Sequence, residues 1–314
     1  MFAVVGHQVN QSRVIAQLVE GFTSRRPMRT TSLIVTLFGD VVSQHGGSIW
    51  LGSLVRAMAP LGLNERLVRT SVFRLVKEGW LEFDRVGRRS YYRFTEYGSH
   101  EYQRAARRIY AMDDQAWNGR WQVVVPLALP DDQRERFRRS LHWQGFRAIS
   151  TGTYAKPGSG GRVLLDTLEE FGAVDQVLVM EADTLPQTPP ALLRDLVQEV
   201  WQLDEVALRY RDFLKHFKPL FKLLQKGTEL ESEAAFIARV LLIHDYRRIL
   251  LQDTRIPQEL LPARWPGDQA LADTGAAYLQ LAKSSVDYIC ANLEGDNGLV
   301  PAVDRRFAMR FSLL

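Results

Sequence analysis

The chain has 314 residues, which is enough for two or three domains of ordinary size. Hydrophobic residues make up 46% and charged residues 24%, so the composition is that of a globular protein and excludes collagen-like, disulfide-scaffold and wholly disordered classes. The net charge of +4 is unevenly spread, because residues 1–110 contain 16 arginines and lysines against 8 acidic residues and the rest of the chain is net acidic. A basic amino-terminal part joined to an acidic body predicts binding to a polyanion.

The sequence carries no sign of membrane insertion or secretion. No apolar run approaches the length of about 18 residues that a spanning helix needs, and the first residues lack the basic and apolar regions of a secretory signal. Cys290 is the only cysteine, which fits a reducing compartment. We therefore expect a cytoplasmic protein with no membrane partner.

Four helices are predicted in the first 79 residues. A short helix with a linker occupies 1–29, and a second helix runs from about residue 30 to the glycine pair at 46–47. The next covers 51–58, and the last runs from Asn64, a good N-cap, to residue 79. The apolar residues of this last helix form one stripe, made by Val68, Val72, Leu75 and Val76. Its other faces are rich in arginine, so the helix has a core face and a basic face.

Two segments rich in aromatic residues, 80–85 and 90–95, predict a β-hairpin after this basic helix. Helices followed by a hairpin with a basic tip are the order of a winged helix-turn-helix, whose last helix enters the major groove while the wing contacts the DNA backbone or minor groove. We expect direct contacts with double-stranded DNA from the last helix, its cap and the wing tip: Asn64, Arg66, Arg69, Thr70, Arg74, Arg88 and Arg89.

A second interpretation of the same pattern is a protein-interaction adaptor. Some winged helices bind only proteins, and a surface arginine is often merely solvated. The basic character of helix and wing together favours DNA. Phe73 either contacts a thymine methyl group or packs against a neighbouring domain or subunit, so it stands outside the expected contacts.

The pattern changes after residue 117. Up to about residue 182 the segments follow the order strand, helix, strand, strand, helix, strand, which is that of a ferredoxin-like sandwich. After a proline-rich linker the chain is mostly helical. The sequence thus predicts a multidomain α+β protein with a helix and linker at 1–29, a winged helix at 30–112, a ferredoxin-like domain at 117–185 and a helical domain at 189–314.

Signals of catalysis are weak. The six histidines are scattered without the spacing of metal ligands, there is no cysteine cluster, and no serine lies in a nucleophile elbow. We therefore expect no enzyme activity, no metal and no cofactor. The competing enzyme hypothesis is a metal-dependent nuclease in which Asp131 or Asp132 holds a divalent ion, and helix capping after Pro130 is the alternative explanation of both residues.

Arginines and aromatic residues are mixed at two places in the helical domain. Arginine side chains beside aromatic rings suit the phosphates and ring system of a ligand that carries a nucleotide. The candidate ligand contacts are Tyr246, Arg247, Arg248, Arg264 and Trp265. A cluster of salt bridges and packed helices explains the same residues equally well.

Several segments together resemble the PaaX family, whose members repress phenylacetic acid degradation. In the amino-terminal part these are Phe38-Gly-Asp40, the basic helix after Asn64, and Gly87-Arg-Arg-Ser-Tyr-Tyr-Arg-Phe-Thr95. Farther along they are Trp117-Asn-Gly-Arg-Trp121, which has Asn118 where an aspartate is expected, and His244-Asp-Tyr-Arg-Arg248 with Leu260-Leu-Pro-Ala-Arg-Trp-Pro-Gly267. The resemblance spans about residues 30–270.

The resemblance implies a repressor with a winged helix, a central ferredoxin-like domain of the Cas2 type and a helical C-terminal domain. It also implies that phenylacetyl-coenzyme A is the effector that inactivates the repressor. Repression itself comes only from the resemblance. We expect a homodimer that reads a palindromic operator, with half-sites about one helical turn apart or a multiple of it.

Overall fold

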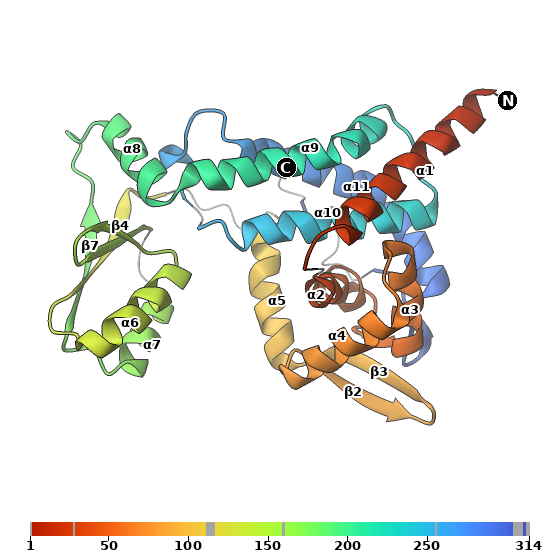
Figure 1. Cartoon of the computed structure of the whole chain (residues 1–314), viewed down its shortest axis with the longest axis horizontal. Coiled ribbons are helices and arrows are strands. Elements are labelled where there is room, and N and C mark those ends of the chain that lie inside the picture. The colour runs from red at the N-terminus through yellow and green to blue at the C-terminus, as the bar shows by residue number, and fades with distance from the viewer. Residues whose placement is uncertain are drawn as a thin grey trace. The chain divides into compact units, whose positions relative to one another are not determined.

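The computed structural model describes residues 2–27, 29–110, 117–158, 161–254, 256–303 and 310–311. The chain forms two compact units, which Figure 1 shows with the elements labelled. The first unit contains Met1–Asp113, Tyr210–Leu250 and Gly267–Leu314, and the second contains Asp114–Arg209 and Leu251–Pro266. Packing therefore joins the amino-terminal elements with most of the C-terminal helices. The domain boundaries expected from the sequence stay a prediction.

The amino-terminal part of the first unit combines helices with a small sheet. In chain order its elements are α1 (Phe2–Thr23), α2 (Thr30–Asp40), β1 (Ser48–Trp50), α3 (Leu51–Met58), α4 (Glu65–Lys77), β2 (Leu81–Val86), β3 (Arg89–Phe94) and α5 (Glu96–Ile109). The strands form an antiparallel sheet in the order β1-β3-β2. The predicted helices and hairpin are present, although α1 has 22 residues rather than being short and α2 ends at Asp40 rather than at the glycine pair. Strand β1 was not predicted, because three residues are too few to show an alternating pattern.

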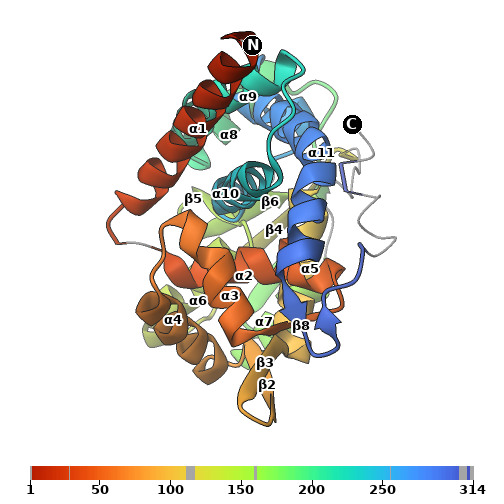
Figure 2. The ribbon, with the colours of Figure 1, turned by 90° about the vertical axis from the view of Figure 1, so that its right-hand side faces the viewer.

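Helix α10 lies at the centre of the first unit. The C-terminal elements of this unit are the part of α9 (Leu203–Gln225) from Tyr210 onward, α10 (Ser232–Leu250), α11 (Pro266–Asn292), β8 (Glu294–Gly295) and β9 (Gly298–Leu299). Helix α10 is buried continuously from Ala235 to Arg247, and α1, α2 and α5 all pack against it (Figure 2). A helix covered on all sides belongs to the core, and it therefore lacks the one-sided stripe of a surface helix.

A buried polar network ties α2 to α5, α10, α11 and the C-terminal segment. Asp40 accepts hydrogen bonds from Arg239 Nε at 2.9 Å, from Arg310 Nη1 at 2.6 Å and from the Tyr110 hydroxyl at 2.6 Å. The Tyr278 hydroxyl donates to the same carboxylate at 2.9 Å. Burial alone raises the pKa of Asp40, but the charges of Arg239 and Arg310 outweigh it and hold the pKa below its usual value.

Gly39 makes room for this network. A β-carbon placed there would lie 1.9 Å from the Tyr102 ring, so only glycine allows α5 to approach α2 this closely. The Tyr102 hydroxyl lies 3.0 Å from that of Tyr110, which extends the network along α5. In the segment Phe38-Gly-Asp40, close packing thus accounts for the glycine, and the buried ion pairs account for the aspartate.

The second unit contains a four-stranded antiparallel sheet and helices. Its elements are β4 (Arg120–Pro126), α6 (Asp131–Trp143), β5 (Arg147–Ser150), β6 (Thr153–Pro157), α7 (Arg162–Glu170), β7 (Val177–Asp183) and α8 (Pro190–Val200). The strand order β5-β6-β4-β7 and the predicted alternation of strands and helices are those of a ferredoxin-like sandwich. Helices α6 and α7 cover one face (Figure 1), with Phe137, Leu141 and Leu164 packed against Val124 of the sheet.

Candidate nucleic-acid interface

Helix α4 is fixed by a buried stripe on one side and by caps at its ends. Val68, Val72 and Leu75 are at most 1% exposed. The Asn64 side-chain oxygen accepts a hydrogen bond from the Leu67 backbone N–H at 2.9 Å, as the predicted N-cap should. Gly79 follows the helix at φ +74°, a conformation that favours glycine. Because its core side is fully packed, α4 presents its opposite face at a fixed orientation.

The opposite face of α4 is exposed and basic. Arg66, Arg69, Thr70 and Arg74 are all exposed, as predicted for contact residues. Arg69 pairs with Glu65 at 2.7 Å, and Arg74 pairs with Glu78 at 2.7 Å. Within each pair the two residues are one helical turn apart on the exposed surface. Exposed pairs of this kind contribute little to stability. Both arginines can therefore exchange their carboxylate for a phosphate or a base edge at small cost.

Two further residues share this face and were absent from the predicted contacts. Phe73 is 70% exposed, and Lys77 is exposed in the last turn of α4. Counted from Arg66, the residues Thr70, Phe73 and Lys77 follow at four, seven and eleven positions. A helix of 3.6 residues per turn places these positions on one side. That spacing is the sequence signal that identifies them.

The hairpin tip presents one unengaged arginine. Strands β2 and β3 are joined by Gly87 and Arg88, with Gly87 at φ +60°, as tight two-residue turns require of glycine. Arg88 is exposed and has no hydrogen bond or ion pair within the described residues. Its guanidinium can therefore meet an external anion without giving up an internal partner.

Arg89 is held by the C-terminal hairpin instead. Its Nη1 donates to Glu294 at 2.9 Å, and its guanidinium lies 4.2 Å from the centre of the Trp50 ring. Arg56 donates to the same Glu294 at 2.8 Å and lies 5.0 Å from the same ring. One carboxylate thus engages two arginines beside the wing, a long-range contact that the sequence pattern did not indicate.

The predicted ligand contacts are divided between the two units. Tyr246, Arg247 and Arg248 belong to the first unit, whereas Arg264 and Trp265 belong to the second. Tyr246 is 2% exposed and its ring lies 5.7 Å from that of Phe213. Trp265 is 7% exposed, whereas Arg264 is exposed. Both aromatic rings are buried, and a ligand role for these five residues stays a prediction.

The acidic pair of the nuclease hypothesis lies in the first turn of α6. Pro130 takes the N-cap position, so Asp131 and Asp132 are helical residues rather than the cap itself. The Asp131 carboxylate lies 3.2 Å from Arg134 Nε. In the described part of the chain no group of three or more histidine, cysteine or acidic side chains has an arrangement that suits a metal ion. Nor does any helix there have the length and apolarity to cross a membrane.

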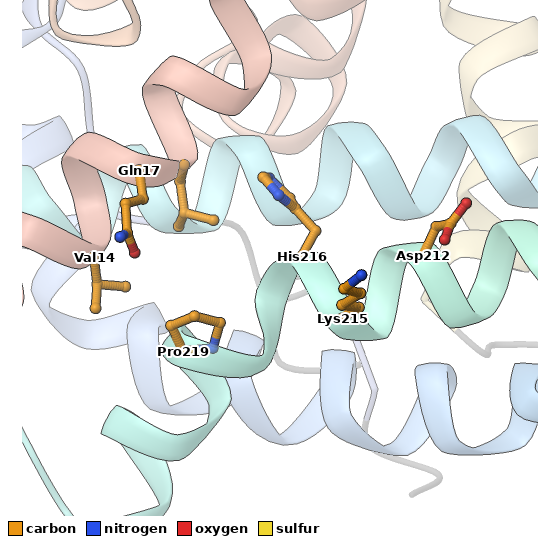
Figure 3. A pocket seen from close by; sticks show the side chains of 7 residues that line it. Val14, Gln17, Asp212, Lys215, His216 and Pro219 are labelled. Atoms are coloured by element: carbon orange, nitrogen blue, oxygen red, sulfur yellow. The ribbon is translucent and has the colours of Figure 1, made fainter.

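Two cavities adjoin helix α1 in the first unit. One of about 380 Å³ is lined from α1 by Val14, Gln17 and Leu18, and from α9 by Asp212, Lys215, His216 and Pro219 (Figure 3). Burial lowers the pKa of His216, so its ring is neutral at pH 7. The other, of about 710 Å³, has Glu20, Glu231 and Glu233 in its wall, and these carboxylates disfavour a ligand that carries phosphates.

Comparison with known proteins assigns the chain to a family. Residues 29–98 match a PaaX-like protein model, residues 114–193 the PaaX protein central Cas2-like domain, and residues 201–291 the PaaX-like protein C-terminal domain. The chain belongs to the PaaX family. The transcriptional repressor PaaX of Escherichia coli K12 is 38% identical over 286 residues, which are 91% of this chain and 90% of that protein.

The family assignment confirms the resemblance inferred from the sequence. The amino-terminal PaaX segment contains every residue predicted to contact DNA, and the C-terminal PaaX segment contains every predicted ligand contact. A solved structure of an uncharacterized protein from Mycobacterium tuberculosis is 21% identical, with a TM-score of 0.49, over 74% of this chain and 88% of that one.

Proposed function

We propose that this protein is a transcriptional repressor whose α2–β3 region is a winged helix-turn-helix. The exposed basic face of α4, together with the free Arg88 at the hairpin tip, is the observation that carries the proposal. The 38% identity to the transcriptional repressor PaaX supports repression rather than activation. The order of helices and the β1-β3-β2 sheet support the winged-helix assignment.

In this proposal α4 enters the major groove. Arg66, Arg69 and Arg74 donate to guanine edges or phosphates, since a guanidinium forks onto either. Thr70 donates to a base edge or a phosphate. The oxygen of Asn64 is already used by the helix cap, so its amide group donates to the DNA backbone.

The wing contributes phosphate contacts. Arg88 is free to neutralise a phosphate at once, whereas Arg89 must first leave Glu294. Each neutralised phosphate releases counterions, so the affinity should fall steeply with salt. A homodimer would pair two such heads on a palindromic operator, with half-sites separated by whole helical turns.

The effector in this proposal is phenylacetyl-coenzyme A, and the regulated genes are those of phenylacetate degradation. Membership of the PaaX family supports both assignments. Release requires that the thioester bind the free repressor more tightly than the DNA-bound one. A difference of about 1–3 kcal/mol between the two binding free energies is enough for a modest switch.

The test is a fluorescence-anisotropy titration of labelled DNA from upstream of the gene itself and of neighbouring promoters. It is run at several salt concentrations, with phenylacetyl-coenzyme A, phenylacetate or coenzyme A, or with none. The proposal predicts tight binding that weakens with salt and is released by the thioester alone. Binding that ignores the thioester contradicts the effector, and the absence of specific binding contradicts the DNA-binding role.

A further inference from the structure

Arg247 is a buried cation without a carboxylate partner among the described residues. It lies near the end of α10 and is 7% exposed. Its Nη1 donates a long hydrogen bond to the Ser32 hydroxyl at 3.3 Å, and its Nε has no partner in the described part of the chain. Burial lowers the pKa of Arg247, and only Tyr102 and Tyr110 oppose this shift. A guanidinium in such surroundings is costly unless an anion binds it.

Ser32 places this cation at the amino-terminal turn of α2. Arg29 occupies the N-cap position without a side-chain hydrogen bond, and the first turn contains no acidic residue. The first backbone N–H groups of a helix have no acceptor inside the helix, and together with the helix dipole they attract an anion. The start of α2 and Arg247 therefore favour the same kind of ligand.

Two further arginines lie near Arg29, the N-cap residue of this turn, because the charge of Arg29 acts on Arg248, which shares the Asp245 carboxylate with Arg25. Arg25 holds Asp245 through two hydrogen bonds of 2.5 and 2.6 Å, so this carboxylate is largely neutralised. Arg248 Nη1 lies 3.5 Å from the same carboxylate, and no described residue is a partner of its Nε. Burial lowers the pKa of Arg248 most; the Asp245 carboxylate opposes this, while the nearby charges of Arg25 and Arg29 lower the pKa further. Among the described residues, the Asp245 carboxylate is thus shared by the guanidiniums of Arg25 and Arg248.

We propose that Arg247, Arg248 and the first turn of α2 form a binding site for a phosphate group of a small ligand. A phosphate would accept hydrogen bonds from both guanidiniums and from the free N–H groups of α2. The identity of the ligand as a coenzyme A thioester rests on the proposed function, whereas the site itself does not. Because α2 packs against α4, the phosphate would be bound by the helix that supports the DNA-contacting face.

The test is isothermal titration calorimetry on the full chain without DNA. The probes are inorganic phosphate, coenzyme A, dephospho-coenzyme A and phenylacetyl-coenzyme A. The variants are Arg247→Met and Arg248→Gln, with Arg211→Gln, an exposed arginine of α9, as the matched control. Each site variant should weaken binding about tenfold or more, and the control should bind like the wild type.

Thermal unfolding provides a second measurement that separates a ligand role from a structural one. Arg247→Met removes an uncompensated buried charge, so it should raise the melting temperature of the ligand-free protein while abolishing the rise caused by ligand. A fall in the ligand-free melting temperature, with the ligand-induced rise retained, would show a structural role and overturn the proposal.

The probes also separate the sources of phosphate. Binding of inorganic phosphate by itself identifies a free-anion site, and binding of coenzyme A probes only identifies a ligand phosphate. No binding of any probe, or equal binding by wild type and Arg247→Met, overturns the site. Because no DNA is present, failure of operator binding leaves this result intact, and failure here leaves the DNA-binding role intact.

Discussion

Arg239 of α10 donates a hydrogen bond to the Asp40 carboxylate of α2 at 2.9 Å, and both side chains are fully buried. The two residues are 199 positions apart in the chain. The pair therefore joins α2, which packs against α4, to α10, the central helix of the C-terminal part. Within the first unit, the proposed DNA-binding elements and the C-terminal helices share one core.

Removing the Asp40 charge should destabilise the protein strongly. In Asp40→Asn the buried guanidiniums of Arg239 and Arg310 lose their carboxylate, and breaking a buried pair in this way costs about 3–5 kcal/mol. Denaturant unfolding measures the change. Asp287→Asn, at an exposed position of α11, is the control and should leave stability nearly unchanged. A loss below about 1 kcal/mol in Asp40→Asn would contradict this account of the network.

His244 should make stability depend on pH. Burial lowers its pKa from 6.5 to about 3, and its Nδ1 lies 3.2 Å from the Thr36 hydroxyl. The unfolded chain therefore takes up a proton that the folded chain refuses as the pH falls below 6.5. The free energy of unfolding should decrease by about 1.4 kcal/mol for each pH unit below that point.

Urea unfolding of wild type and His244→Asn at pH 7.5, 6.5 and 5.5 checks this dependence. Asparagine retains a donor for Thr36 but does not titrate. The variant should lose the contribution of this one histidine, so the two stabilities should converge as the pH falls. A constant difference between the two proteins across this range would show that His244 does not titrate as described.

Phe73→Ala should weaken operator binding without changing its salt dependence. The ring is 70% exposed on the basic face of α4, where it can meet a thymine methyl group. No charge is removed, so the slope of affinity against salt should stay the same. Anisotropy titration measures both quantities, with Leu279→Ala on α11, where Leu279 is 53% exposed, as the control. Equal loss in both variants would point to a general effect on folding.

Glu294→Gln should strengthen DNA binding and steepen its salt dependence. Glu294 engages both Arg56 and Arg89, so its neutralisation frees the arginine of the wing. The slope of log affinity against log salt should become steeper by about one for each additional phosphate contact. An unchanged slope in the anisotropy titration would mean that Arg89 does not reach the DNA.

The local elements were predictable because their signals are local. Helix α3 has the predicted bounds, and the cap of α4 by Asn64 follows from one residue and its neighbours. The exposed arginines of α4 follow from its periodicity. The ferredoxin-like order followed from the alternation of short apolar and amphipathic segments.

Long-range contacts were not predictable from these patterns. The partners of Asp40 come from distant segments, and no spacing in the sequence connects them. The hairpin of β8 and β9 has two residues in each strand, too few for any alternation, yet it brings Glu294 to Arg89. The predicted ligand contacts combined residues that fall in two separate compact units.

The most direct measurement of the central claim compares the operator affinity of three proteins. These are the wild type, the double variant with Arg69→Ala and Arg74→Ala, and a control. The control, Arg136→Ala, Arg139→Ala, removes two exposed arginines from α6. We predict that the control binds like the wild type, while the α4 variant loses about a hundredfold or more in affinity at the same salt concentration. Wild-type affinity in the α4 variant would contradict the assignment of α4 as the helix that reads DNA.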